Sequence, residues 1–112
     1  MRAFPKRGEM WWVSFPDDPQ VRPALVVSTD ARNEFANSVL AVPVTTNLRP
    51  SPTHVRLPAG TGGLSVDSMA RSENVSYIHK SRLDSGPLGN AVSSRHMREV
   101  EAALQIALGL SP

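Results

Sequence analysis

The sequence contains no cysteine, and its three histidines, His54, His79 and His96, lie far apart along the chain. The absence of cysteine excludes disulfide bridges and thiolate metal ligands, and the wide histidine spacing differs from the close pairs typical of zinc sites. No apolar run approaches the ~20 residues that a membrane-spanning helix needs. The basic N-terminal segment also lacks the apolar stretch of a signal peptide. These absences predict a cytoplasmic protein with no metal, no cofactor and no membrane partner.

Aromatic residues are also scarce, at 5% of the chain, whereas 40% of its residues are hydrophobic. A chain of 112 residues with this apolar content is expected to form one small domain, spanning residues 1–112. The formal net charge is only +2, but ten of the twelve basic residues are arginine. Arginine binds phosphate in a bidentate fashion and stacks on bases, so the composition suits an RNA ligand. A general bias towards arginine would give the same composition.

Nine of the ten prolines and six of the seven glycines lie in the first 92 residues and divide them into short segments. Between these breaks lie runs rich in β-branched and aromatic residues, which predict strands. The run after Arg22 is apolar on both faces and is therefore expected to be a central strand. Residues 30–37 are expected to form a polar connection that can include a helical turn. The predicted strands are Glu9–Phe15, Pro23–Ser28, Ser38–Thr45, Thr53–Leu57, Leu64–Ala70 and Asn74–Ile78.

The C-terminal segment changes to helical periodicity and predicts a helix from about Ser94 to Leu108. Ser93 is a suitable N-cap and Gly109 a suitable C-cap. Short strands followed by one helix predict a mainly β protein, a small antiparallel barrel or half-barrel whose open side the helix covers. The apolar helix positions are Met97, Val100, Leu104 and Leu108.

Polar side chains stand at the ends of two predicted strands. Arg22 precedes Pro23, which restricts it to an extended backbone, so a stiff element aims its guanidinium. A rigidly held cation can stabilise a charged transition state. Thr45 and Thr46 end another strand, and their hydroxyls can bind phosphate. The alternatives are an ordinary surface arginine and threonines placed by strand preference alone.

Two further pairs are candidates. Trp11 and Trp12 are adjacent and face opposite sides of a strand, so one is expected in the core and the other is available to stack on a base or to pack against a second subunit. Arg71 and Glu73 alternate and are expected to share a strand face, where they form either a proton-transfer pair or a solvated ion pair.

The order and spacing of these segments resemble the MazF/PemK/Kid family of toxin endoribonucleases over nearly the whole chain. The resemblance implies an SH3-like barrel (PemK/MazF/CcdB-like) with a C-terminal helix, and a homodimer. It also implies metal-independent cleavage of single-stranded RNA at short motifs, in which the ribose 2′-hydroxyl attacks the phosphate to leave a cyclic phosphate and a 5′-hydroxyl. A cognate antitoxin protein is the implied partner, in a complex that binds DNA. The matching segments are Gly8–Trp12, Arg22–Ser28, Pro43–Thr45, Leu64–Asn74 and Lys80–Leu83.

The resemblance assigns the main catalytic role to Arg22, with assistance from Thr45 at the phosphate; Glu73 is the candidate base. The sequence departs from the family pattern at two points. The loop over residues 16–21 is short, which affects RNA access, and Glu73–Asn74 stands where the family usually has Asp–Gln. The residues expected to bind RNA are Trp11, Thr46, Asn47, Arg71 and Arg82.

Two other functions remain open. A gyrase poison of the CcdB type shares the fold, but the chain ends Gly109-Leu110-Ser111-Pro112 and lacks the aromatic tail of those proteins. An inactive RNA-binding or protein-binding module on the same fold would bind RNA without cleaving it.

Overall fold

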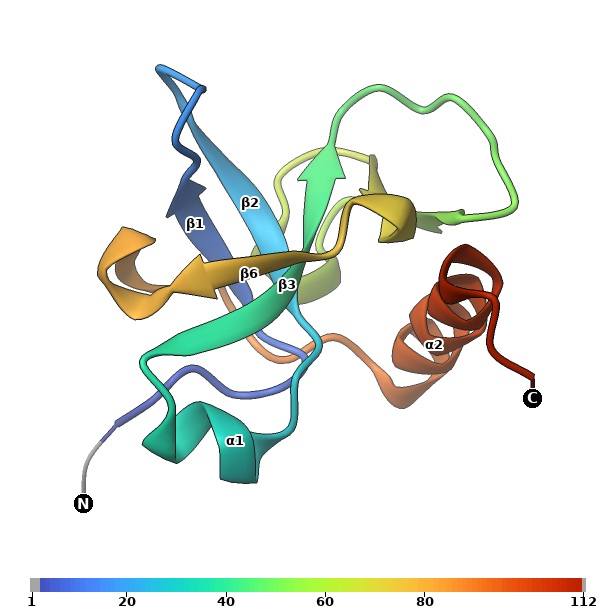
Figure 1. The fold of residues 1–112 in the computed structure, drawn as a ribbon. Coiled ribbons are helices and arrows are strands. Elements are labelled where there is room, and N and C mark those ends of the chain that lie inside the picture. The colour runs from blue at the N-terminus through green and yellow to red at the C-terminus, as the bar shows by residue number, and fades with distance from the viewer. Residues whose placement is uncertain (1–2, 112) are drawn as a thin grey trace.

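The computed structural model describes residues 3–111. Within this range, short strands make up the first three quarters of the chain and a long helix follows (Figure 1). The strands are β1 (Met10–Ser14), β2 (Val21–Val26), β3 (Ser38–Thr45), β4 (His54–Leu57), β5 (Ser68–Arg71), β6 (Ser76–His79) and β7 (Leu83–Pro87). The α-helices are α1 (Asp30–Phe35) and α2 (Ser94–Leu108), and the 3-10 helices are η1 (Thr61–Gly63), η2 (Ser72–Asn74) and η3 (Lys80–Arg82).

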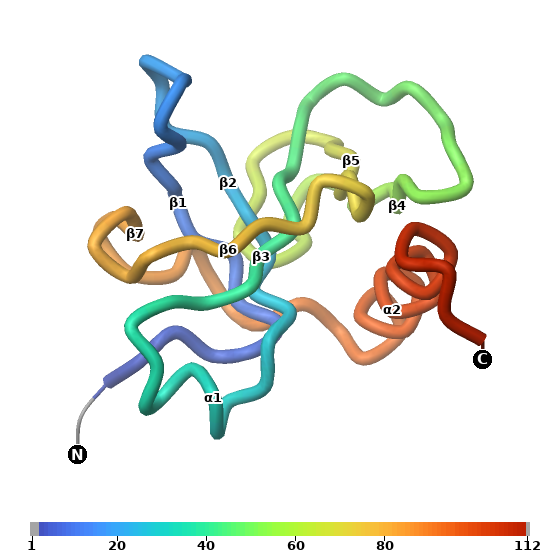
Figure 2. Tube along the Cα trace, viewed as in Figure 1, coloured from blue at the N-terminus to red at the C-terminus, as the bar shows by residue number. Residues whose placement is uncertain are grey.

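The strands form one antiparallel sheet in the order β4-β5-β3-β2-β1-β7, with β6 also paired to β3. β3 is the longest strand and serves several neighbours: its first half pairs with β6 and its end with β5, while β2 lies along the other edge. The connection from β3 to β4 arches away from the sheet (Figure 2). The sheet is curved but not closed, so the prediction of a small barrel-like β fold with a C-terminal helix is confirmed in its open form.

Each face of the sheet buries its own hydrophobic cluster. Leu25 and Val26 are consecutive in β2 and both are fully buried, one in each cluster. This confirms that β2 is a central strand with two apolar faces. The larger cluster lies beneath α2 and includes Met10, Val42 and Val100.

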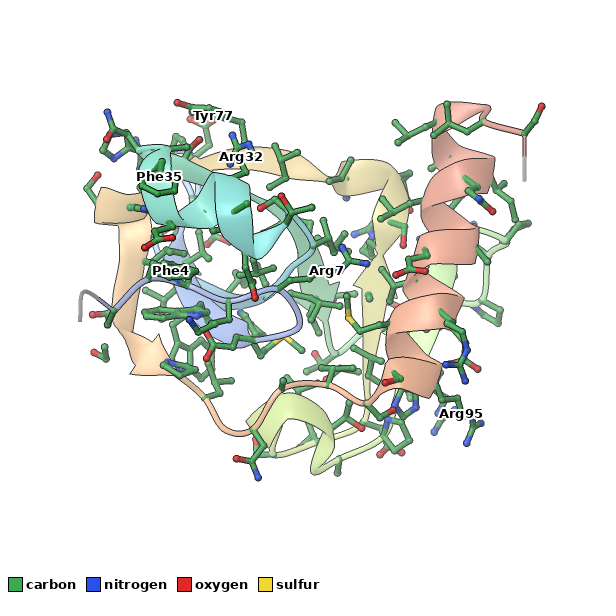
Figure 3. The ribbon with its side chains drawn as sticks, turned by 90° about the horizontal axis from the view of Figure 1, so that it is seen from below. Phe4, Arg7, Arg32, Phe35, Tyr77 and Arg95 are labelled. Carbon is green, nitrogen blue, oxygen red and sulfur yellow. The ribbon has the colours of Figure 1, made fainter. Side chains whose placement is uncertain are left out.

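Helix α2 has the bounds and caps expected from the sequence. The Ser93 hydroxyl accepts a hydrogen bond from the backbone N–H of His96 at 3.2 Å, and Gly109 ends the helix with a φ of 70°. Arg7, from the segment before β1, donates to the carbonyl of Val27 and to the carboxylate of Glu101 on α2 (Figure 3). These contacts tie the helix to the start of the chain and the end of β2.

The structure differs from the sequence-based expectations in three places. The predicted strand over residues 64–70 begins only at Ser68, the first residue of β5. Strand β7 was not predicted, because Ser85 and Gly86 both adopt positive φ, at 61° and 89°, and Pro87 follows them. Arg71 and Glu73 do not share a strand: β5 ends at Arg71, and Glu73 lies in η2, the turn that carries the chain from β5 to β6. No helix in the described part of the chain is long and apolar enough to cross a membrane.

Candidate active site

A cleft of about 480 Å³ crosses β3 between the start of β2 and the turn that joins β5 to β6. It brings together three of the predicted site residues, Arg22, Thr45 and Arg71, which lie far apart in the sequence. Two arginines beside a threonine hydroxyl form a surface suited to a phosphate group. The remaining lining residues are Phe15, Asp18, Pro43, Val44, Asn74 and Ser76.

Arg22 is the second residue of β2, and its side chain is half exposed at the cleft. Its Nε donates to Asp18 Oδ2 at 2.8 Å, from the loop between β1 and β2. The backbone N–H of Gln20 also donates to Asp18, at 3.0 Å. This amide and then the Arg22 guanidinium hold the pKa of Asp18 below its usual value. The ionised carboxylate therefore fixes Nε of Arg22 and leaves its two terminal nitrogens for a ligand.

Thr45 ends β3 with its hydroxyl at the cleft. Its Oγ1 accepts a hydrogen bond from the backbone N–H of Asn47 at 3.1 Å. Because that bond uses a lone pair of the oxygen, the hydroxyl proton is available to a phosphate oxygen. Thr46 faces a neighbouring hollow of about 410 Å³, which Arg22 and Trp12 also line.

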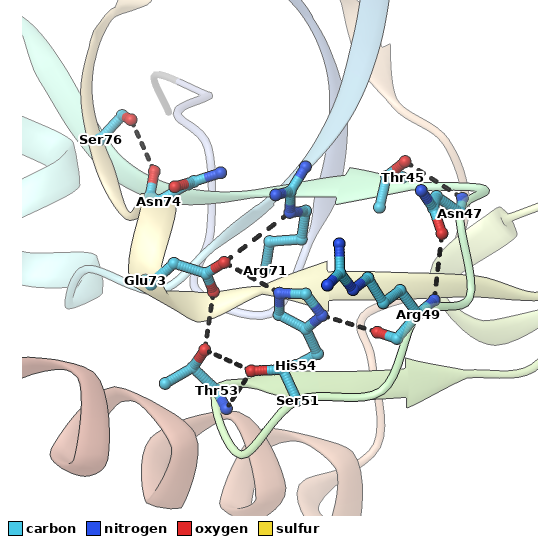
Figure 4. Close-up of polar contacts among 10 residues, drawn as sticks. All are labelled: Thr45, Asn47, Arg49, Ser51, Thr53, His54, Arg71, Glu73, Asn74 and Ser76. Atoms are coloured by element: carbon cyan, nitrogen blue, oxygen red, sulfur yellow. Dashed lines mark hydrogen bonds and ion pairs between the residues drawn. The ribbon is translucent and has the colours of Figure 1, made fainter.

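Arg71 borders the cleft next to a polar cluster centred on Glu73 (Figure 4). Glu73 Oε2 accepts from His54 Nε2 at 2.8 Å and lies 3.8 Å from Arg71 Nε. Glu73 Oε1 accepts from the Thr53 hydroxyl at 2.9 Å. The carboxylate thus holds strand β4 and the end of β5 together.

Burial alone would raise the pKa of Glu73, but hydrogen bonds from His54, from its own backbone N–H and from Thr53 outweigh it and lower the pKa. Glu73 is therefore ionised at neutral pH, with both oxygens engaged. It is not among the residues that line the cleft, whereas Asp18 is. The catalytic role given to Glu73 stays a prediction, and the geometry favours a supporting role.

Three other predicted RNA contacts lie outside the cleft lining. Trp11 packs against the smaller core cluster and donates from Nε1 to Glu9 at 3.1 Å, so it is Trp12, 39% exposed, that stands beside Arg22. Asn47 lies in the β3–β4 connection, where its side chain accepts from the N–H of Arg49 at 3.1 Å. Arg82 donates to the carbonyl of Ser14 at 3.3 Å. Their roles in RNA binding also stay predictions.

Sequence reasoning missed Asp18 and His54. Asp18 stands four residues before Arg22. This spacing brings an acidic and a basic side chain together on a helix, and here it does so across a tight turn. His54 gave no local signal, because its partners Arg49 and Glu73 meet it only in the folded chain. Within residues 3–111, no group of three or more acidic or histidine side chains is placed to hold a metal ion.

Comparison with known proteins places this geometry in a family. Residues 6–108 match the model of the PemK-like, MazF-like toxin of type II toxin-antitoxin systems. The chain is 36% identical to endoribonuclease MazF9 of Mycobacterium tuberculosis, over 94% of this chain and 97% of that one. It is 30% identical to endoribonuclease EndoA of Bacillus subtilis, over 94% and 95% of the two chains. A solved mycobacterial endoribonuclease in complex with its cognate antitoxin superposes with a TM-score of 0.83 at 30% identity, over 96% of this chain and 98% of that one. The chain belongs to the PemK-like, MazF-like toxin family of type II toxin–antitoxin systems.

Proposed function

We propose that this MazF-family toxin endoribonuclease cleaves single-stranded RNA in the Arg22 cleft, without a metal ion. The observation that carries the proposal is the convergence of Arg22, Thr45 and Arg71 on one cleft, with Asp18 fixing the guanidinium of Arg22 at 2.8 Å. The relatives at 36% and 30% identity are named endoribonucleases, which supports RNA as the substrate.

In the proposed reaction, the ribose 2′-oxygen forms a bond to the adjacent phosphorus and the bond from phosphorus to the 5′-oxygen breaks. The 2′-hydroxyl loses its proton to a base, and the leaving 5′-oxygen gains one. Arg22 and the Thr45 hydroxyl stabilise the charge that develops on the non-bridging oxygens. Arginine does not deprotonate at neutral pH, so Arg22 acts as a cation and hydrogen-bond donor.

The carboxylate best placed to accept the 2′-proton is Asp18, because it lines the cleft. Glu73, the candidate favoured by family resemblance, is the second choice, because it is not among the residues that line the cleft. The short loop between β1 and β2 brings Asp18 to Arg22, which argues for a working cleft and against an inactive module.

The experiment is incubation of the purified protein with a long unstructured RNA in EDTA, beside an Arg22→Ala variant. Wild type is expected to give discrete fragments with 5′-hydroxyl and cyclic phosphate ends, and the variant is expected to cleave about 10²–10³ times more slowly at matched concentration. Cleavage that requires a divalent metal, or equal cleavage by the variant, would sink the proposal. Binding of RNA without cleavage would favour the inactive module instead.

We also propose that the protein acts in the cytoplasm as a homodimer inhibited by an antitoxin. Phe35 and Tyr77 are 81% and 67% exposed, on α1 and β6, on the side of the molecule where Arg32 also lies (Figure 3). Tyr77 stands opposite Leu40 in the register of β6 and β3. Exposed apolar side chains grouped in this way suit a subunit interface. Light scattering of the purified toxin, and its co-purification with the protein encoded beside it, test the two assignments.

A further inference from the structure

The ring of His54 lies between a backbone carbonyl and a carboxyl group. Its side chain is 9% exposed. Nδ1 lies 2.8 Å from the carbonyl oxygen of Arg49, and Nε2 lies 2.8 Å from Glu73 Oε2. A carbonyl oxygen has no proton to give, and a neutral imidazole donates from only one of its two nitrogens.

Both contacts are satisfied together only if the ring carries a proton on each nitrogen or if Glu73 is protonated. The second state is disfavoured, because Glu73 also accepts from Thr53 at 2.9 Å and lies beside the Arg71 guanidinium. The lowered pKa of Glu73 agrees with an ionised carboxylate. The ring of His54 therefore faces an ionised carboxylate on one side and a backbone carbonyl on the other.

We propose that His54, as a doubly protonated ring, is a positioning residue that locks the β3–β4 connection to the Glu73–Arg71 pair and so sets the shape of the RNA cleft. This inference rests on the proposed endoribonuclease function. His54 does not touch the cleft itself.

One set of contacts links His54 to Arg71 through Glu73. His54 on β4 stands directly opposite Arg71 on β5. The Arg71 Nε is buried without a hydrogen-bond partner among the described residues, 3.8 Å from Glu73. The carboxylate is thus the group that restrains the guanidinium, and His54 holds the carboxylate (Figure 4).

A second set of contacts links His54 to Thr45 through Arg49 and Asn47. The Arg49 carbonyl belongs to a chain of contacts in which Arg49 N–H donates to Asn47 and Asn47 N–H donates to the Thr45 hydroxyl, each at 3.1 Å. The contact between His54 and the Arg49 carbonyl therefore restrains the β3–β4 connection, which begins at the cleft residue Thr45 (Figure 4). One ring restrains both walls of the cleft.

The other charged groups that line the groove beside His54 come from α2 and β4. Arg95, His96 and Glu99 line the groove of about 530 Å³ that His54 shares with the helix, and Arg56 lines it from β4. Arg95 pairs with Glu99 at 3.9 Å. Glu73 is the anion in direct contact with the ring, so loss of the ring proton breaks either the Glu73 contact or the Arg49 contact.

The first test is nitrogen-15 NMR of the histidine rings in the whole protein at pH 6.5. Proton-bearing shifts are expected at both nitrogens of His54, with a coupling or exchange signature of hydrogen bonding at each. One unprotonated nitrogen at that pH would overturn the proposal. This measurement does not depend on RNA cleavage, so it stands even if the proposed function fails.

The second test compares RNA cleavage by wild type and His54→Gln between pH 6 and 9, with His79→Gln as the control. His79 is exposed, and its ring contacts Ser81 away from the cleft. The Gln amide reaches Glu73 but carries no charge and leaves the Arg49 carbonyl unpaired. We expect kcat to fall about tenfold at pH 6.5, as for a misplaced cleft group, and His79→Gln to match wild type.

A His54→Gln variant whose melting temperature and kcat both match those of wild type would overturn the proposal. Wild type without activity on any RNA would instead count against the proposed function.

Discussion

Asp18 and Arg22 form an ion pair at the mouth of the cleft, with Arg22 Nε donating to Asp18 Oδ2 at 2.8 Å. The pair joins the end of the β1–β2 loop to the start of β2. Exposed ion pairs of this kind add little stability, so its importance lies in geometry. By occupying Nε, Asp18 leaves the two terminal nitrogens of Arg22 for a bidentate contact with phosphate.

The first prediction concerns the fork of Arg22. Arg22→Ala is expected to lower kcat by about 10²–10³, or about 3–4 kcal/mol, the loss typical of one donor to a developing oxyanion. Arg22→Lys keeps the charge but loses the planar pair of donors, so its kcat should lie between those of wild type and Arg22→Ala. Single-turnover cleavage of one short RNA gives these rates. Full activity in the Lys variant would show that charge alone suffices.

The second prediction separates the two candidate bases. Asp18→Asn should lower kcat by about 10². This loss is at the low end of the range for general base catalysis, because a carboxylate with a lowered pKa is a weak proton acceptor. Glu73→Gln should cost less, since Glu73 lies outside the cleft lining. Parallel rate measurements on the two variants decide the assignment. A larger loss in Glu73→Gln would return the base role to Glu73.

The third prediction follows from the lowered pKa of Glu73. A carboxyl whose pKa is lower when folded than its usual value of 4.5 stabilises the protein above that pH, and the contribution disappears as the pH falls through the folded value. The melting temperature of wild type should therefore fall more steeply below about pH 4.5 than that of Glu73→Gln. Glu99→Gln, on the exposed face of α2, is the control and should follow wild type.

The neighbouring elements β7 and α2 differ in how far the sequence predicts them. Helix α2 was predicted with its bounds, because Ser93 and Gly109 are local signals that act within one turn of the helix. Strand β7 was missed, because it is held by pairing with β1 and not by its own composition, and its register shifts between Trp11 and Trp12. Strand pairing with a distant segment overrides local preference.

The candidate site divides in the same way. Arg22 and Thr45 could be predicted because each stands near the end of an apolar strand. The sequence does not predict which side of the sheet Trp11 and Trp12 each face, because adjacent residues in a strand are equivalent until the register is known. The contact between His54 and Glu73 spans 19 residues and depends on η2, which the alternation of Arg71 and Glu73 concealed.

The last prediction tests the packing of the loop that lines the hollow next to the cleft. Gly63 adopts a φ of +91°, and a Cβ there would lie 2.5 Å from the Leu88 carbonyl. Gly60 has a similar φ of +94°, but a Cβ there meets nothing within 4 Å. Gly60→Ala should therefore cost only the backbone strain of a non-glycine residue, about 1–2 kcal/mol. Gly63→Ala adds a clash with backbone that cannot rotate away, and should cost about 4 kcal/mol or more. Urea unfolding of both variants measures the difference, and equal losses would show that the chain around Leu88 yields freely.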